Sequence, residues 1–213
     1  MDFFLPPICP ACRSGSAGRE GLCAACLDAA APEPAWAEGV AALAATGSAA
    51  AYRGLAEEMI KALKYSGRLA MVRPLGGLLA NLLARTAAGP AQACDILAPV
   101  PLHPRRLTER GFNQSLLLTK ELARQAGLRA RLSPGLLQRV RYTRPQVELN
   151  GFERAANVRG AFAVAASAGV RGRRVLLIDD VCTTGATLRE CAAALRSAGA
   201  AEVVALTVAR AGS

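Results

Sequence analysis

Residues 175–188 read Val175-Leu176-Leu177-Ile178-Asp179-Asp180-Val181-Cys182-Thr183-Thr184-Gly185-Ala186-Thr187-Leu188. The four apolar residues at the start are typical of a strand that is buried on both faces of a sheet. A helix is predicted from Gly185 to Ser197 and a further strand from Val203 to Val208. Strands that alternate with helices predict an α/β fold, in which a mainly parallel twisted sheet is flanked by helices.

The loop between this strand and this helix has the chemistry of a sugar-phosphate site. Ligands of open α/β sheets bind at the carboxyl ends of the strands, where Asp179 and Asp180 are expected. Backbone N–H groups at the start of the helix lack internal partners and, with the threonine hydroxyls, attract a phosphate. The carboxylates accept hydrogen bonds from the hydroxyls of a ribose, so the loop predicts a ribose 5-phosphate site. The alternative is an acidic strand end that only caps the helix.

Other parts of the chain supply further elements of such a fold. A short apolar run from Cys94 to Val100 predicts a buried strand, and the prolines around Val100 predict a constrained loop after it. The segment from Val40 to Tyr52 predicts a short hairpin that turns at residues 46–48. Three amphipathic helices are predicted, over residues 54–65, 72–88 and 113–126. The third is expected to be capped by Asn113 and Gln114.

Four of the seven cysteines form two C-x-x-C pairs, Cys9 with Cys12 and Cys23 with Cys26. Each pair can direct two thiolates at one ion from a tight turn, and Zn²⁺ prefers four such ligands in a tetrahedron. A site of four thiolates has no open position, so we predict a structural zinc ion. Two disulfides are the alternative, which a reducing cytoplasm disfavours.

A stretch rich in alanine and proline follows the cysteine pairs and is typical of a linker. We therefore predict two domains. Residues 1–38 form a zinc ribbon-like module with its linker, and residues 39–213 form the larger α/β domain.

The positive charge of the chain is concentrated in one region. The formal charge is +10, and residues 101–174 hold fifteen basic side chains against four acidic ones. This imbalance predicts a local site for a polyanion, with a solvated arginine-rich surface as the alternative. Within this region, residues 138–160 are polar, arginine-rich and without a period, which is typical of a functional loop or lid.

The apolar runs of the chain are shorter than the roughly 18 to 20 residues of a membrane span. The first residues include Asp2, whereas a secretory signal has basic residues there. A cytoplasmic protein without a membrane span is therefore expected.

The chain resembles the type I phosphoribosyltransferases. Their signature consists of apolar residues, two acids, an apolar residue, any residue, Thr-Thr-Gly, any residue, and Ser or Thr, and residues 176–187 meet every specified position. Within that group the chain is most similar to the ComF family, the amidophosphoribosyltransferase-like competence proteins with an N-terminal double C-x-x-C zinc element. Three further blocks agree with that family: residues 63–68, residues 99–115, and the spaced set Arg139-x3-Thr143-x2-Gln146-x2-Leu149-x4-Arg154-x2-Asn157.

The resemblance implies binding of phosphoribosyl pyrophosphate together with Mg²⁺. Asp179 and Asp180 are then the catalytic acids that contact the ribose hydroxyls. The 5-phosphate is expected in the loop of Val181, Cys182, Thr183, Thr184, Gly185, Ala186 and Thr187. The pyrophosphate is expected against Val100, Pro101, Leu102, Arg105, Arg106 and Arg110, because arginine forks bind phosphate oxygens in pairs. A lid over the ligand would include Arg139, Thr143, Gln146, Arg154 and Asn157.

His103 is the only histidine of the chain. It lies in the proline-rich loop of the expected pyrophosphate site. Its position suits either a general acid or base or a residue that packs the loop and forms hydrogen bonds there.

The resemblance leaves two classes of function open. The first is an enzyme that transfers the phosphoribosyl group to an unidentified acceptor in competence or DNA uptake. Its residues would mainly position groups and neutralise the leaving pyrophosphate. The second is a non-catalytic competence module that binds single-stranded DNA or a helicase, although aromatic residues for stacking on DNA are sparse in the basic region. A sensor that only binds phosphoribosyl pyrophosphate would carry the same residues.

Overall fold

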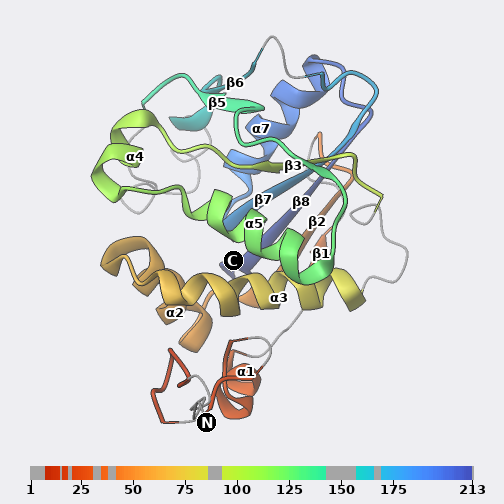
Figure 1. The fold of residues 1–213 in the computed structure, drawn as a ribbon. Helices are drawn as coiled ribbons and strands as arrows, with labels where there is room; N and C mark the ends of the chain where they lie inside the picture. The colour runs from red at the N-terminus through yellow and green to blue at the C-terminus, as the bar shows by residue number, and fades with distance from the viewer. Residues whose placement is uncertain are drawn as a thin grey trace, which may run out of the picture.

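The computed structural model describes residues 8–14, 16–18, 21–30, 35–37, 42–85, 93–142, 157–165 and 169–212. In these ranges a six-stranded sheet has the order β1-β2-β8-β7-β3-β4 (Figure 1). Its strands are β1 (Ala35–Ala37), β2 (Ala45–Ala51), β3 (Ile96–Pro99), β4 (Arg131–Leu132), β7 (Arg174–Cys182) and β8 (Glu202–Arg210). The edge strand β1 pairs antiparallel with β2, and the remaining pairs are parallel. The predicted mainly parallel sheet is confirmed.

Helices lie on both faces of this sheet (Figure 1). One face carries α2 (Gly54–Ser66), α3 (Val72–Arg85) and α5 (Gln114–Ala126), and the other carries α7 (Ala186–Ser197). The shorter helices are α1 (Ala24–Ala29), α4 (Pro104–Arg110) and the 3-10 helix η1 (Leu69–Met71). A separate two-stranded sheet consists of β5 (Leu137–Arg139) and β6 (Phe162–Val164).

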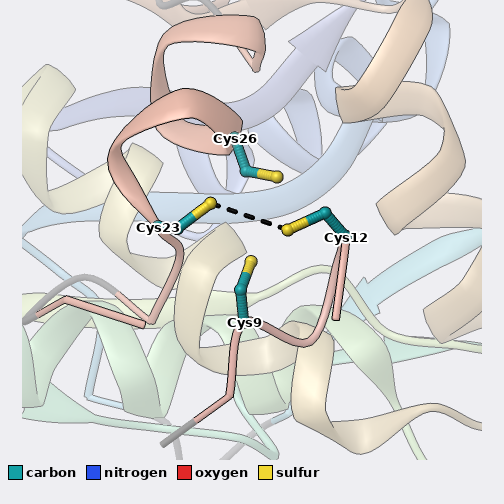
Figure 2. A group of neighbouring side chains, drawn as sticks. All are labelled: Cys9, Cys12, Cys23 and Cys26. Atoms are coloured by element: carbon teal, nitrogen blue, oxygen red, sulfur yellow. Dashed lines mark hydrogen bonds between the residues drawn. The ribbon is translucent and has the colours of Figure 1, made fainter. Parts of the chain in front are cut away.

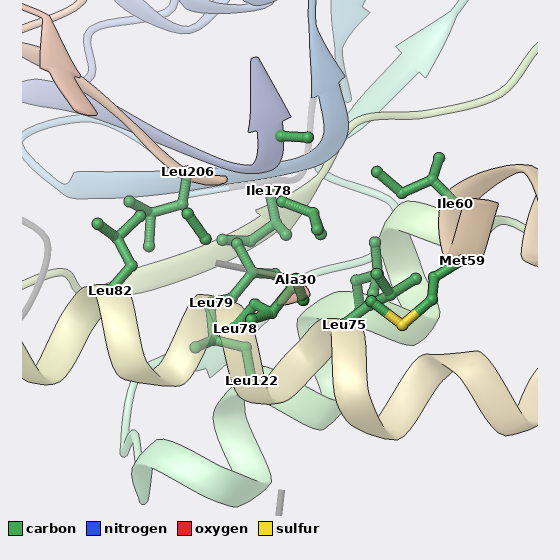
Figure 3. Close-up of a cluster of buried hydrophobic side chains, with 14 of the residues drawn as sticks. Ala30, Met59, Ile60, Leu75, Leu78, Leu79, Leu82, Leu122, Ile178 and Leu206 are labelled. Atoms are coloured by element: carbon green, nitrogen blue, oxygen red, sulfur yellow. The ribbon is translucent and has the colours of Figure 1, made fainter. Parts of the chain in front are cut away.

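The apolar core follows from the alternation of side chains along β7, where neighbouring residues point to opposite faces. Leu176 and Ile178 pack on one face with the leucines of α3 and α5 (Figure 3). Val175 and Leu177 pack on the other face with α7. Because helices cover both faces, the apolar run before Asp179 is completely buried, as its composition predicts.

The predicted hairpin at residues 46–48 is wrong. These residues lie inside β2, which pairs with β8 on one side and with β1 on the other. The small residues serve close packing instead of a turn, because a Cβ atom on Gly47 would lie 2.8 Å from Leu206 and 3.0 Å from Trp36.

The N-terminal cysteine segment packs directly on the larger α/β unit. Cys9, Leu22, Cys26 and Ala30 are buried in the same apolar cluster as the side chains of α2 and α3. In addition, Arg68 Nη2 donates a hydrogen bond to the carbonyl of Pro10, at 3.4 Å. The two parts therefore share one core, and a division into residues 1–38 and 39–213 stays a prediction.

Helices α3 and α5 touch at Gly76, where a larger side chain does not fit. A Cβ atom there would overlap Cγ of Glu121 and lie 2.8 Å from its Cβ. Gly76→Leu is expected to lower the free energy of unfolding by about 3 kcal/mol through overpacking, measured by urea denaturation. Glu121→Ala removes the opposing Cγ atom and should recover part of this loss in the double variant. Strictly additive effects of the two changes would contradict the close contact.

In the ranges that the structure describes, no helix combines the length and the apolarity that crossing a membrane requires.

Candidate functional site

The two acids lie inside β7, which continues beyond the predicted apolar run as far as Cys182. The strand is longer because β8 also continues, so that Val181 pairs with Ala209 and Cys182 with Arg210. Asp179 and Asp180 thus lie on a rigid element near the carboxyl edge of the sheet, and both side chains are buried.

Each of the two acids contacts a side chain from a different helix. Asp180 Oδ1 lies 2.8 Å from Lys64 Nζ of α2, with side chains 5% and 18% exposed respectively. Asp179 Oδ1 accepts hydrogen bonds from Ser115 Oγ of α5 at 2.8 Å and from the amide of Asp180 at 2.9 Å. Asp180 Oδ2 is buried and has no hydrogen-bond partner among the described residues. A buried acceptor of this kind is costly unless a ligand or water satisfies it.

The surroundings of Asp179 change the pKa of its carboxyl group. Burial, followed by the neighbouring charge of Asp180, raises the pKa of Asp179 to about 7, against the opposing effects of Lys64 and Ser115. The pair therefore holds less than two full negative charges at neutral pH.

This raised pKa predicts how stability depends on pH. An aspartate of the unfolded chain has a pKa of about 3.9, so between about pH 4 and 7 the folded state binds a proton that the unfolded state has released. The contribution of Asp179 to stability is therefore largest below about pH 4, falls as the pH rises to about 7, and is constant above that. Relative to the wild type, Asp179→Asn is expected to gain stability over this window in urea denaturation. A difference that is constant with pH would contradict the assignment.

The expected 5-phosphate loop connects β7 to α7. The helix begins at Ala186, and Gly185 is its N-cap, with a φ of 72° and no side-chain cap hydrogen bond. Thr184 accepts two hydrogen bonds, at Oγ1 from the Ala186 amide (3.4 Å) and at its carbonyl from Arg189 Nη1 (3.1 Å). The hydrogen bonds of Asp179 described above go to Ser115 and to β7, which does not support the alternative of a helix-capping acid.

The expected pyrophosphate loop, Val100 to Leu102, follows β3 next to β7. The Val100 amide donates to the Ile178 carbonyl at 3.0 Å, and the Val100 carbonyl accepts from Asn113 Nδ2 at 3.1 Å. Asn113 Oδ1 also accepts from the Ser115 amide at 2.9 Å, so the predicted cap of α5 at Asn113 is confirmed. Gln114 instead belongs to the first turn of the helix.

His103 is the N-cap of α4. Its Nδ1 atom accepts a hydrogen bond from the Arg105 amide at 3.3 Å. This contact favours the local hydrogen-bonding role over acid–base chemistry.

The three arginines expected at the pyrophosphate all lie on α4 but differ in their surroundings. Arg105 is exposed, pairs with Glu109 at 3.0 Å and lies over the ring of Tyr142, 5.1 Å from its centroid. Arg110 is partly buried and donates to Gln114 Oε1 at 2.5 Å. Burial lowers the pKa of Arg110, while the charge of Asp180 acts in the opposite direction. The nearby charge of Arg106 also lowers the pKa of Arg110. Because Asp180 and Asp179 act on the pKa of Arg110 as well, this arginine lies close enough to the acids to interact with them electrostatically.

The predicted lid is described only at its two ends. Arg139 of β5 lies over the ring of Phe162, 5.3 Å from its centroid. Burial lowers the pKa of Arg139, and the charge of Asp179 opposes this shift. The carbonyl of Asn157 accepts from Arg141 Nη2 at 3.1 Å. Thr143, Gln146 and Arg154 lie outside the described residues, so the lid stays a prediction.

The four N-terminal cysteines point toward one another (Figure 2). Their Sγ atoms all lie within 4.8 Å of one another, and Cys12 Sγ lies 3.7 Å from Cys23 Sγ. In a tetrahedral site with Zn–S bonds of about 2.3 Å, neighbouring sulfurs are about 3.8 Å apart. All four are free thiols, which does not support the alternative of two disulfides. The cluster can hold a metal ion such as zinc.

Sequence reasoning missed two residues of the acidic site, Lys64 and Ser115. Both belong to segments that match the family pattern, so a signal was present. The pattern does not say which acid each residue contacts, because these contacts join different helices to β7.

Comparisons with known proteins agree with this architecture. Residues 113–213 match the phosphoribosyl transferase domain. The DNA utilization protein YhgH of Salmonella typhimurium is 33% identical over 198 residues, which are 92% of this chain and 81% of that protein. Competence protein F of Haemophilus influenzae is 38% identical over 121 residues, which are 55% of this chain and about half, 51%, of that protein.

A solved structure is also similar in part. It is the glutamine phosphoribosylpyrophosphate amidotransferase from B. subtilis complexed with ADP and GMP. The similarity has a TM-score of 0.39 and 26% identity, and it covers 62% of this chain and 25% of that chain.

Proposed function

This chain belongs to the ComF family of phosphoribosyltransferase-like competence proteins, and from that premise we propose that it binds phosphoribosyl pyrophosphate with Mg²⁺. The observation that carries the proposal is the buried acidic pair at the carboxyl edge of the sheet. One oxygen of this pair, Asp180 Oδ2, is buried without a hydrogen-bond partner among the described residues. A ribose hydroxyl would satisfy it.

Each part of the site has a role in this proposal. Asp179 and Asp180 hold the ribose hydroxyls, and the loop from Val181 to Thr187 holds the 5-phosphate at the start of α7. The backbone of Val100 to Leu102 lies against the pyrophosphate, and Arg110 neutralises part of its charge. Transfer to an acceptor, which is not identified, then requires that these groups keep the ribose in place as the pyrophosphate leaves.

The charges of the site fit a complex of the ligand with Mg²⁺. Lys64 forms an ion pair with Asp180, and a cation held by the oxygens of the ligand would favour the charged form of Asp179, whose pKa is raised in the protein alone. The ion would neutralise part of the negative charge of the pyrophosphate.

We further propose that Cys9, Cys12, Cys23 and Cys26 hold a structural zinc ion. Four thiolates leave no open coordination position, so the ion would stabilise the fold. Free thiols available as metal ligands are typical of a reducing compartment, which supports a cytoplasmic location.

The test is calorimetric titration of zinc-loaded protein with phosphoribosyl pyrophosphate in the presence of Mg²⁺. Binding at a ratio of one ligand per chain is expected, and ribose 5-phosphate and pyrophosphate alone are expected to bind more weakly because each fills only part of the site. Release of pyrophosphate in a screen of nucleobases would then identify the acceptor. Absence of binding to folded, metal-loaded protein would overturn the proposal.

A second function, binding of single-stranded DNA in competence, is supported by one surface feature. Arg105 lies over the exposed ring of Tyr142, which His103 also contacts edge-on at 5.1 Å. Arginine and aromatic side chains together form stacking platforms for bases. Binding of a short oligonucleotide that weakens steeply with added salt and depends on Tyr142 would support this function, with a helicase as a further candidate partner.

A further inference from the structure

Lys64 is a mostly buried cation at the acidic site, with a side chain that is 18% exposed. It lies in the last turn of α2, and its Nζ atom is 2.8 Å from Asp180 Oδ1. One turn earlier, Lys61 forms the contrasting kind of ion pair: it lies 2.7 Å from Glu57, and its side chain is 55% exposed. The two lysines thus provide a buried pair and an exposed pair on the same helix.

A buried ion pair is a poor source of stability by itself. Removing two charges from water costs free energy that their mutual attraction only partly returns, so an apolar pair of similar size is often at least as stable. Stability alone therefore does not explain why a lysine occupies position 64. The reason lies in its partner, because Asp180 is next to Asp179 in β7, and two buried carboxylates at one site repel each other.

The position of Lys64 is fixed by the fold. Its neighbours on α2, Ile60 and Leu63, are buried in the core. The helix ends at Gly67, whose φ of 60° suits the left-handed C-cap and whose amide donates to the Ala62 carbonyl. Lys64 consequently reaches Asp180 from a rigid helix end.

We propose that Lys64 is a positioning residue of the sugar-phosphate site, which holds the Oδ1 atom of Asp180 so that Oδ2 is left to accept a ribose hydroxyl. This inference rests on the proposed function. The two oxygens of this carboxylate then have different partners. Oδ1 contacts Lys64, and Oδ2 would accept a hydrogen bond from the ligand. The unpartnered, buried Oδ2 atom agrees with this division.

Other charged groups near the acids do not take this role. The groups that act electrostatically on Lys64, Asp179 or Asp180 come from several elements, and they include Tyr52, Tyr65, Arg110, Arg139, Cys182 and Cys191. Arg110 is engaged with Gln114, and Arg139 lies over Phe162 and is coupled to Asp179. Lys64 makes the ion pair with Asp180.

The first test measures the acids without any ligand. The carboxyl carbons of Asp179 and Asp180 are followed by NMR at pH 7, with Asp180→Asn to assign the signals. In Lys64→Met the loss of the contact with Oδ1 is expected to shift the carboxyl signal of Asp180, whereas Lys61→Met should leave it unchanged. Lys64→Arg should largely restore the wild-type signal.

The second test measures binding of phosphoribosyl pyrophosphate with Mg²⁺ at pH 7. Because Asp180 then lacks the partner that holds its Oδ1 atom, Lys64→Met is expected to bind about tenfold more weakly. Lys64→Arg should remain close to the wild type, and Lys61→Met should equal it. Should Lys64→Met fail to fold, Lys64→Gln provides the same comparison without the charge.

The outcomes separate this inference from the proposed function. An unchanged carboxyl signal of Asp180 in Lys64→Met would overturn the role of Lys64, whether or not the ligand binds. A loss of affinity in Lys64→Met that Lys64→Arg does not rescue would also overturn it. A wild type that fails to bind the ligand would overturn the proposed function, and the NMR comparison without ligand would still decide the role of Lys64.

Discussion

Replacement of both Asp179 and Asp180 by asparagine is expected to weaken binding of phosphoribosyl pyrophosphate by at least about a hundredfold, because each hydrogen bond to a charged group contributes about 1.5–3 kcal/mol. Asparagine keeps the size and an acceptor oxygen of the side chain but removes its charge. The effect is therefore expected in binding, measured by calorimetry with Mg²⁺ present, more than in the shape of the site.

The stability of this double variant needs to be known before its binding is interpreted. Asp179→Asn relieves the repulsion between the acids, whereas Asp180→Asn leaves Lys64 buried without its counter-ion. The two effects on folding are thus opposite in sign. The single variants, each with a measured Tm, separate lost binding from lost fold.

Asp95→Asn is a control that matches the charge of each single variant. Asp95 lies just before β3, at the opposite end of the strands from the acidic pair, where its Oδ2 atom accepts from the Arg174 amide at 2.8 Å. It is expected to bind the ligand as the wild type does. If the double variant bound as tightly as Asp95→Asn, the acidic pair would not be the ribose site.

Removal of the metal ion from the cysteine cluster is expected to have the largest effect on stability. The four thiolates would otherwise repel one another, and Cys9 and Cys26 belong to the core that also includes α2 and α3. A loss of about 5 kcal/mol or more would lower the Tm by roughly 10–20 °C for a chain of this size. Treatment with a strong chelator, followed by thermal unfolding and metal analysis, measures the effect.

Matched cysteine variants separate metal binding from packing. Cys12 is an exposed member of the cluster, so Cys12→Ser removes a ligand with little loss of buried surface. Cys94 lies outside the cluster, and Cys94→Ser should retain one zinc ion per chain and a nearly unchanged Tm. Full zinc content and an unchanged Tm in Cys12→Ser would rule out the four-cysteine site.

Short-range patterns predicted much of the fold correctly. The apolar run before Asp179 predicted a strand buried on both faces, and β7 is such a strand. Asn113 was recognised as a helix cap because its side chain needs only amides two and three residues away. The segment around Gly47 was predicted wrongly. Its small residues are typical of a turn, but here they lie in a strand and leave room for the side chains of Trp36 and Leu206.

The sequence by itself therefore determined the α/β class, the four convergent cysteines and the place of the two acids at the end of a buried strand, because each depends on the spacing of neighbouring residues. The tertiary structure alone decided how the acids are held: Lys64 arrives from α2, and Ser115, 64 residues before Asp179, arrives from α5. It also left one oxygen of Asp180 without a partner among the described residues. Such contacts depend on how helices pack across a sheet, and packing depends on the shapes and volumes of many distant side chains, which no local pattern encodes.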